Sequence, residues 1–505
     1  HQLQLIQNAC AKAITGKYKH DHFRPVSTLP IFGKIFEKII YTRLYGFLSS
    51  QGILHDCQFG FRKGHSTSHA LNYSVHQIKQ ALGRGDHVLG IFIDLSKAFD
   101  TIDHQTLLTK LEHYGIRGVA LKLITSYLSD RKQYVGVLDE ISEHLPVLYG
   151  VPQGSCLGPL LFLIYINNLT NAHKTSQYIL FADDTNIFIV SKNRTDLYKN
   201  ANTVLESVHN YTLANKLHIN IGKSCYMEFS KSRNSRQLVN DTLAETEIFI
   251  NGTALEKVEA TKFLGLIVDK NLNWDAHRLK LVKKLSSCSG ILNRMKDHIP
   301  QSLHKDLYHT LFESHLTYGI TVWGGISDTK MDSLFKAQKK CIRIMFGDRE
   351  KYLEKFKTCA RTRAVDSQKL GVDFYRKEHT KPLFSKHKLM TIHNLYLYHC
   401  INDVAKILKF RTPISIFSLI DLSKRTGKET LALPPKPSDS YAYRATVIWN
   451  AARKKLSLLE FTFTTSQIKT SLRKAIFSAQ SQGEPLQWEK TTNDIKYVFG
   501  VHSTN

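Results

Sequence analysis

The chain has 505 residues and carries 69 lysines and arginines against 43 acidic residues, which gives a formal net charge of +26 at pH 7. This length allows two or more domains with substantial cores, and a hydrophobic content of 42% excludes a disordered basic tail. The excess of positive charge favours a polyanionic partner.

Cysteine usage and hydropathy narrow the cellular setting. The eight cysteines form no C-x-x-C pair, so neither a disulfide scaffold nor a structural zinc site is expected. No signal peptide is apparent, and no apolar run approaches the roughly 18 residues of a membrane span. We therefore expect an intracellular protein, nuclear or cytoplasmic and not secreted, that makes no membrane contact.

The first segment of the chain repeats a pattern found near its other end. The string LQLIQNACAKAITG at residues 3–16 is similar to LFKAQKKCIRIMFG at residues 334–347. Two amphipathic basic helices can share such a pattern by chance, and the alternative is that residues 1–20 come from a rearranged second copy. We expect residues 1–20 to be extraneous to the catalytic core.

Hydrophobic periodicity predicts the next elements in chain order. Residues 33–48 have apolar side chains at helical spacing, and residues 88–93 form a buried strand that leads into Asp94. Asp103 can cap another helix, which Gly115 ends.

A loop rich in Gly and Pro follows, at Gly150–Ser155, and precedes an apolar segment at residues 157–169. Such a loop lets a backbone approach a ligand closely, and the start of the next helix favours phosphate.

Two acidic residues then lie between two short apolar strands. Residues 178–181 and 187–190 flank Asp183 and Asp184, a pattern that predicts a β-hairpin with carboxylates at its tip. Asp pairs are common in turns, so the pair alone is weak evidence of function. Together with Asp94, however, the acids at strand ends form a cage for hard divalent cations, for which Mg²⁺ is the usual choice. After the hairpin, Thr195 can cap a helix.

Seven strings in this chain resemble motifs of one family in their expected order. Together they resemble the reverse transcriptase of a non-LTR (LINE-type) retrotransposon, over roughly residues 21 to 345. The strings are RPVSTLPIFGKIFEKIIYTRL (24–44), QFGFRKGHST (58–67), FIDLSKAFD (92–100), GVPQGSCLGPLLFLIYINNL (150–169), FADDTNIF (181–188), HINIGKS (218–224) and FLGLIVD (263–269).

The resemblance implies an α+β right-hand polymerase fold, whose fingers and palm, with an antiparallel sheet, span residues 21–235. A thumb-like region at 236–345 and a basic, mainly helical C-terminal region at 346–505 follow. Residues 351–411 hold 14 Lys and Arg against 5 Asp and Glu, interleaved with aromatics such as Phe384. This composition suits a nucleic-acid surface as well as a merely solvated charged face.

The resemblance also assigns roles around the acids. Asp94 and Asp183 are expected to bridge two Mg²⁺ ions, for which Mn²⁺ is an alternative, and Asp184 supports them. Lys223 corresponds to a lysine that protonates the leaving pyrophosphate. Phe99 would block a ribose 2′-hydroxyl and so select deoxynucleotides, although a Phe is more often a core residue.

Other residues are assigned to substrate contacts by the same resemblance. Gln153 and Gly154 would lie against the incoming nucleotide, and Arg62 would hold its triphosphate bidentately. Arg24 would lie near the template, and Phe263, Leu264 and Gly265 would form the hairpin that grips the primer.

The expected function is therefore an RNA-directed DNA polymerase that extends a primer 3′-hydroxyl with dNTPs on an RNA template. Its expected partners are the RNA template and a DNA primer or nicked target DNA; the pattern does not indicate an oligomeric state. No endonuclease domain is visible, so target cleavage would come from elsewhere. Three alternatives stay open. They are a catalytically inactive or domesticated RNA-binding protein, disfavoured by the intact acids, a group II intron-like maturase, and an RNA-dependent RNA polymerase, disfavoured by Phe99.

Overall fold

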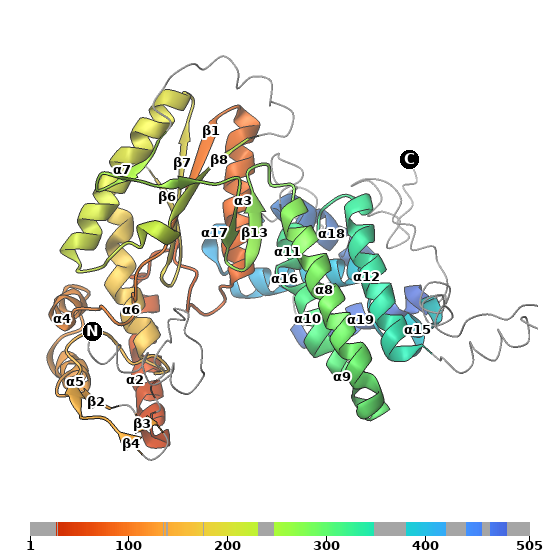
Figure 1. Ribbon diagram of the computed structural model, residues 1–505, viewed down its shortest axis with the longest axis horizontal. Coiled ribbons are helices and arrows are strands. Elements are labelled where there is room, and N and C mark those ends of the chain that lie inside the picture. The colour runs from red at the N-terminus through yellow and green to blue at the C-terminus, as the bar shows by residue number, and fades with distance from the viewer. Residues whose placement is uncertain are drawn as a thin grey trace, which may run out of the picture. The chain divides into compact units, whose positions relative to one another are not determined.

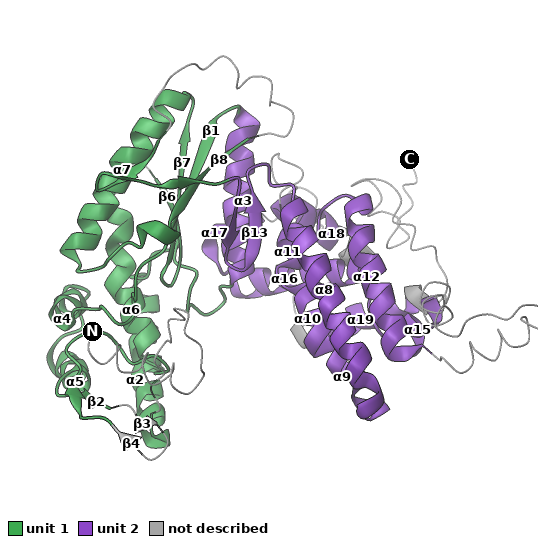
Figure 2. Cartoon of the chain, in the orientation of Figure 1, with its two compact units in different colours: residues 1–66, 85–258 green, residues 67–84, 259–505 purple. Residues whose placement is uncertain are grey.

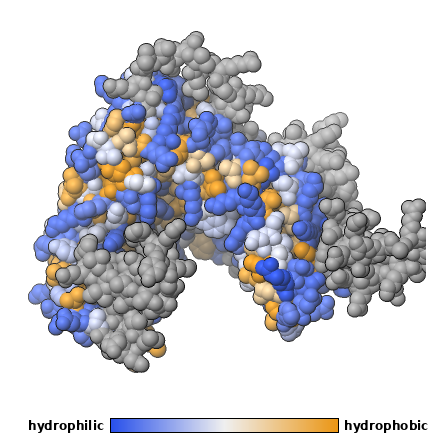
Figure 3. Space-filling view, in the orientation of Figure 1, coloured by the Kyte–Doolittle hydropathy of each residue, from blue (hydrophilic) through white to orange (hydrophobic). Residues whose placement is uncertain are grey.

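The computed structural model divides the chain into two compact units (Figure 2). Unit 1 comprises His1–Ser66 and Gly85–Val258, and unit 2 comprises Thr67–Arg84 and Glu259–Asn505. The structure describes residues 27, 29–134, 136–137, 140–174, 176–230, 247–347, 380–420, 441–456 and 465–481. On the face shown in Figure 3, hydrophilic residues cover most of the described surface, as the high charge of the chain leads one to expect.

Unit 1 contains a five-stranded sheet with the strand order β11-β8-β1-β7-β6 (Figure 1). The central strand β1 is antiparallel to both β7 and β8, whereas β11 runs parallel to β8. Mixed strands and helices thus give the α+β class that the sequence predicted. The strands are β1 (His87–Ile93), β6 (Gln177–Phe181), β7 (Asp184–Ser191), β8 (Cys225–Phe229) and β11 (Glu256–Lys257).

Strand β1 is buried because both of its faces are covered. Leu89, Ile91 and Ile93 alternate along one face and belong to the main core, to which helices α6 (Gly158–Ile166) and α7 (Arg194–Ala214) also contribute. Every residue of α6 except the half-buried Pro159 is buried, so this helix lies inside the unit.

Unit 1 also contains further helices and short strands. The helices are α2 (Ile31–Ser50), α4 (His104–His113), α5 (Gly118–Leu128), η1 (Asn167–Asn171) and η2 (Ile221–Lys223). Of these, α2, α4 and α5 contribute residues to this core. The short strands are β2 (Lys132–Gln133), β3 (Gly136–Val137), β4 (Glu140–Ile141), β5 (Leu145–Pro146), β9 (Phe249–Ile250) and β10 (Thr253–Ala254).

Two of the predicted helix caps can be compared with the structure. Asp103 caps α4 as predicted, because its Oδ1 accepts a hydrogen bond from the Thr106 N–H at 2.9 Å. The prediction of Thr195 as the cap of α7 was wrong by two residues. Asn193 is the N-cap, and its side chain accepts from the Thr195 N–H at 3.0 Å.

The described part of unit 2 is mainly helical and contains a two-stranded hairpin, β12 (Ala260–Phe263) and β13 (Leu266–Asp269). Gln338 helps to hold its helices together although it is polar and fully buried. Its amide donates to Tyr308 and to the Met390 carbonyl, both at 2.9 Å, and accepts from the Ile392 N–H at 2.8 Å. All three hydrogen bonds are buried, and both the nitrogen and the oxygen of the amide have partners.

Within the described residues, unit 2 consists mainly of helices and short helical turns. They are α3 (Thr67–Arg84), α8 (Asp275–Met295), η4 (Lys296–His298), η5 (Gln301–Leu303), α9 (His304–Leu307), the π-helical η6 (Tyr308–Glu313), α10 (Ser314–Thr317), α11 (Ile320–Trp323), α12 (Asp328–Phe346), α15 (Lys381–Lys386), α16 (Ile392–Phe410), α17 (Ile414–Phe417), α18 (Tyr441–Leu456) and α19 (Thr465–Ser481). Within the described ranges, no helix combines the length and the apolar character needed to cross a membrane.

Candidate active site

The predicted acidic hairpin is formed by β6 and β7. Phe181 pairs with Asp184, so Ala182 and Asp183 make a two-residue turn between the strands. Ala182 has a φ of +57°, which places it in the left-handed region. Tight hairpins need such a conformation at the turn, but for a residue with a Cβ it costs roughly 1 kcal/mol or more. The surroundings must therefore hold this turn.

Residues 57–60 lie against the turn and supply that support. The Oε1 atom of Gln58 accepts the N–H of Ala182 at 3.1 Å and the N–H of Gly60 at 2.8 Å. The backbone of Gln58 also forms an isolated parallel β-bridge with Leu180, and Gln58 is only 2% exposed. A Cβ at Gly60 would lie 2.3 Å from the Ala182 nitrogen, so only glycine fits there.

Sequence reasoning missed these two residues. Gln58 and Gly60 lie in the string QFGFRKGHST, more than a hundred residues before the hairpin that they contact. A Gln–x–Gly pattern has no specificity by itself, and the only local signal was that Gly60 breaks an otherwise bulky run.

Asp94 follows β1 and lies at the same end of the strands as the hairpin turn. Ile93, the last residue of β1, pairs with Thr185, so the next residue, Asp94, comes alongside Asp184 on β7. Asp94 is half-buried. The acids predicted from the sequence are thus brought to one end of neighbouring strands.

Lys223 lies on the segment that runs beside Asp94. The Asp94 N–H donates to Ser224 Oγ at 3.1 Å, and the Asp94 carbonyl accepts from the Asn220 N–H at 2.8 Å. Lys223 is the residue before Ser224 and is exposed. Its side chain is therefore open to solvent beside the strand that carries Asp94.

Asp103 anchors the chain beyond this segment. Although burial opposes ionisation, hydrogen bonds from Lys216 and Thr106 hold the pKa of Asp103 at about 2. The Lys216 ammonium lies 2.7 Å from the Asp103 carboxylate. Asp103 precedes α4 and ends the segment that begins at Asp94, and Lys216 follows α7 and begins the segment that leads to Lys223. The ion pair therefore joins these two segments.

The loop at Gly150–Ser155 pairs with the segment that carries Phe99. The Val151 N–H donates to the Phe99 carbonyl at 2.9 Å, and the Gln153 amide donates to Asp100 Oδ1 at 2.7 Å. Gly150 (φ +83°) and Gly154 (φ +103°) adopt the positive angles that the loop requires. The structure therefore places the loop that carries Gln153 against the segment that carries Phe99.

The Phe99 ring is half-buried and packs against other aromatics. It stacks on Phe162 with centroids 4.5 Å apart and meets Phe61 edge-on at 6.2 Å. Phe99 therefore packs against the core, and part of its ring is accessible to solvent.

Comparisons with known proteins decide the family. A family model described as reverse transcriptase (RNA-dependent DNA polymerase) matches residues 16–268. The chain belongs to the reverse transcriptase family. The predicted resemblance to non-LTR retrotransposon enzymes is confirmed by its relatives. It is 27% identical, over 64% of its length, to a probable RNA-directed DNA polymerase from transposon X-element of Drosophila melanogaster.

Two further relatives belong to the same class of elements. This reverse transcriptase family member is 25% identical, over 65% of its length, to the RNA-directed DNA polymerase from mobile element jockey of Drosophila melanogaster. It is 27% identical, over 60% of its length, to a Pol polyprotein from type-1 retrotransposable element R1 of Bradysia coprophila. It spans 36%, 36% and 29% of the X-element, jockey and R1 proteins, respectively. A telomerase structure from Candida albicans aligns over 66% of this chain and 57% of its own, with 12% identity and a TM-score of 0.37.

The sequence of this reverse transcriptase family member also predicted Arg62 and Arg24 as substrate contacts. Arg62 Nη1 donates to the His55 carbonyl at 2.8 Å and to the Gln58 carbonyl at 3.3 Å, so Arg62 holds the turn that supports the hairpin. Its predicted contact with a triphosphate stays a prediction. Arg24 lies outside the described residues.

Phe263, Leu264 and Gly265 form the turn of the β12–β13 hairpin in unit 2. Leu264 (φ +45°) and Gly265 (φ +86°) adopt the two positive angles of a tight hairpin turn. Tyr318 donates its hydroxyl to the Leu264 carbonyl at 2.8 Å and packs over Gly265, which fixes the turn. The predicted hairpin therefore exists, and its contact with a primer stays a prediction.

The side chains at the edge of the sheet suit a hard metal ion. Asp94, Asp183 and Asp184 offer only carboxylate oxygens, which are the ligands that Mg²⁺ prefers. Among the residues that the structure describes, no three His, Cys, Asp or Glu side chains are arranged to hold a metal ion. The chemistry of the donors nevertheless fits, because Mg²⁺ is commonly bound by one or two carboxylates together with substrate phosphates.

Proposed function

We propose that this chain is an RNA-directed DNA polymerase of a non-LTR retrotransposon, which extends a primer 3′-hydroxyl with dNTPs on an RNA template. The observation that carries the proposal is the tip of the β6–β7 hairpin. There a strained turn, held by Gln58, presents Asp183 and Asp184 next to the end of β1, where Asp94 follows. Strain that the surroundings maintain at an acidic turn supports a functional role for it.

Each residue then has a definite task. Asp94 and Asp183 would hold two Mg²⁺ ions, with Asp184 in support; such ions lower the pKa of a bound hydroxyl and neutralise developing phosphate charge. Lys223 would donate a proton to the leaving pyrophosphate. Gln153 and Gly154 would position the nucleotide.

Phe99 and Arg62 would select and bind the nucleotide. The Phe99 ring is fixed by Phe162 on one side, so its free edge would exclude a 2′-hydroxyl without moving. Arg62 would turn a donor toward the triphosphate, since its Nε is buried without a hydrogen-bond partner among the described residues.

We further propose a right-hand arrangement, with fingers and palm at residues 21–235 and a thumb at 236–345. The basic region at 346–505 would contact the RNA template, and the protein would act inside the cell, in the nucleus or cytoplasm. The family of the chain and its net charge of +26 support these proposals.

The test is primer extension on a primed RNA with Mg²⁺ and dNTPs, comparing Asp183→Asn with the control Asp196→Asn. Both substitutions remove one negative charge from unit 1, but Asp196 is exposed on the first turn of α7. We expect Asp183→Asn to lower the extension rate by about three orders of magnitude, since several kcal/mol of transition-state stabilisation are lost. The control should extend normally.

RNA binding by Asp183→Asn should stay close to that of the wild type. If this variant retained more than about a tenth of wild-type extension, the loss would be below 1.4 kcal/mol and Asp183 would not be a metal ligand. A wild-type chain that binds RNA but extends no primer would instead favour an inactive RNA-binding protein.

A further inference from the structure

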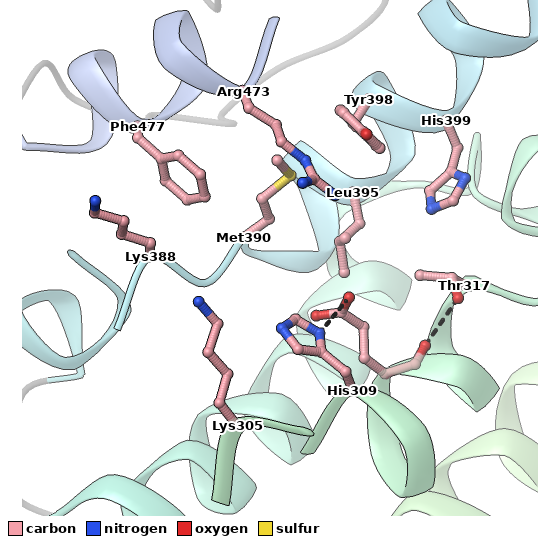
Figure 4. A pocket seen from close by; sticks show the side chains of 11 residues that line it. Lys305, His309, Thr317, Lys388, Met390, Leu395, Tyr398, His399, Arg473 and Phe477 are labelled. Carbon is pink, nitrogen blue, oxygen red and sulfur yellow. Dashed lines mark hydrogen bonds and ion pairs between the residues drawn. The ribbon is translucent and has the colours of Figure 1, made fainter. Parts of the chain in front are cut away.

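Unit 2 contains a cavity of about 430 Å³, which is large enough for a small ligand (Figure 4). Segments that are far apart in the sequence line it, from α9 to α10, the chain after α15, α16 and α19. The lining residues are Lys305, His309, Glu313, Thr317, Lys388, Met390, Leu395, Tyr398, His399, Arg473 and Phe477.

The charges around this cavity are unbalanced. Three permanent cations, Lys305, Lys388 and Arg473, face a single acid, Glu313, which leaves a net charge of +2 when the histidines are neutral (3 − 1). Glu313 Oε1 already lies 2.9 Å from His309 Nδ1. Within the described parts of the chain, none of the three cations has a carboxylate partner in an ion pair. Grouped like charges repel, so an anion in the cavity would be favourable.

The cations are combined with an aromatic and apolar wall. Arg473 lies over the Tyr398 ring, with its guanidinium carbon 5.5 Å from the ring centroid. In Figure 4, Arg473 and Lys305 point into the space between the helices, and the Phe477 ring lies beside it. Cations that meet phosphates and a ring that stacks on a base are the two components of single-strand recognition.

The backbone at Lys388 is a second, independent observation. Lys388 follows α15 with a φ of +51°, and its N–H donates to the Ser385 carbonyl at 3.2 Å. This is the position after a helix where glycine is preferred, because a Cβ is disfavoured there. A positive charge that binds an anion in the cavity would explain why a lysine, and not a glycine, occupies this position.

We propose that this cavity binds one nucleotide of a single-stranded nucleic acid. Its phosphate would be bound by Lys305, Lys388 and Arg473, and its base would stack on Phe477. The site lies wholly in unit 2 and takes part in binding only, so it does not depend on the polymerase assignment. Two of its cations, Lys388 and Arg473, are exposed, which lets a strand enter from the surface.

The experiment compares two matched pairs of variants that remove the same charge from neighbouring positions. Arg473→Gln is compared with Lys474→Gln, and Lys388→Gln with Lys386→Gln. All four residues are exposed, but only Arg473 and Lys388 line the cavity. Binding of a fluorescein-labelled single-stranded RNA of 15 nucleotides is measured by anisotropy, in EDTA and without dNTPs, so that a failure of catalysis cannot affect it.

We expect each cavity variant to raise the Kd about tenfold, the loss expected for one charge-assisted hydrogen bond. The slope of log affinity against log salt should fall by about 0.7 for each, because one phosphate contact fewer is made. The two control variants should change both quantities much less. Equal weakening within each pair would show that only overall charge matters and would overturn the proposal.

Phe477→Leu tests the base contact while keeping an apolar side chain in the wall. It should weaken RNA binding about fivefold or more. The same substitution should have no effect on binding of an abasic strand of equal length. If both strands lost affinity equally, no base would stack on Phe477. Full displacement of the RNA by millimolar adenosine monophosphate would assign the site to free nucleotides and overturn its assignment to a strand.

Discussion

Replacing Gly60 by alanine should displace the acidic hairpin. The new Cβ would lie 2.3 Å from the Ala182 nitrogen and 2.9 Å from the Phe181 carbonyl carbon, both of which are backbone atoms. Ordinary contacts begin near 3.4 Å, so the two segments must separate by about 1 Å (3.4 − 2.3). Overpacking of this kind costs roughly 1–3 kcal/mol of stability.

The separation would also lengthen the hydrogen bond from the Ala182 N–H to Gln58, which is already 3.1 Å long. Without it, the turn that carries Asp183 can relax from its left-handed conformation. Since a misplacement of about 1 Å at a reacting centre can lower a rate about a hundredfold, we expect extension by Gly60→Ala to fall by that order.

The assay is steady-state primer extension, together with urea unfolding of the same preparations. Gly46→Ala is the matched control, because nothing lies within 4 Å of a Cβ at this position in α2. It should raise the free energy of unfolding by about 0.5–1 kcal/mol and leave extension unchanged. Wild-type extension and stability in Gly60→Ala would refute the argument that this close approach holds the turn.

Three further outcomes are expected. Lys388→Gly should raise the thermal unfolding temperature, since glycine relieves up to about 1 kcal/mol of left-handed strain, while RNA binding measured by anisotropy weakens. Burial opposes ionisation of Glu228, but hydrogen bonds from Arg194 and Tyr198 hold its pKa at about 2, below its ordinary 4.5. As the pH drops from 5 to 2, the wild type protonates Glu228 and loses this interaction, whereas Glu228→Gln has no such charge to lose. In urea titrations, the free energy of unfolding of the wild type should therefore fall by up to about 3 kcal/mol more than that of the variant. Phe99→Ala should raise the ratio of NTP to dNTP use in steady-state extension, and an unchanged ratio would leave Phe99 as a core residue.

The acid-bearing strands could be predicted because their signals are local. An apolar run before Asp94 and two apolar runs around Asp183 each mark a strand within a few residues. Once β1 and β7 pair in register, Asp94 after β1 and the acids at the start of β7 must lie at the same end of the two strands. The hairpin and the strand before Asp94 are therefore where prediction and structure agree.

The support of the turn could not be predicted, because it joins distant segments. Gln58 and Ala182 are 124 positions apart, and no periodicity connects them. The apolar spacing at residues 33–48 predicted helix α2, but it does not determine which of its side chains are buried. Leu44 and Leu48 are buried, but Phe36 is 61% exposed, since helical spacing shows where apolar residues lie and not whether another element covers them.

The cavity of unit 2 shows that the charge of a sequence does not determine where a charged partner binds. The sequence suggested a nucleic-acid surface at residues 351–411, but Phe384, one of its aromatics, is only 2% exposed and cannot stack on a base. The ring that we propose to stack on a base is Phe477, in a region without any local motif. Of the three cations that line the cavity, at positions 305, 388 and 473, only Lys388 lies within residues 351–411. Composition can therefore indicate the class of partner, because charges add wherever they lie in the chain. The place where that partner binds depends on which charges the fold brings together, and α9, α16 and α19 must pack before Lys305, Lys388 and Arg473 can act on one phosphate.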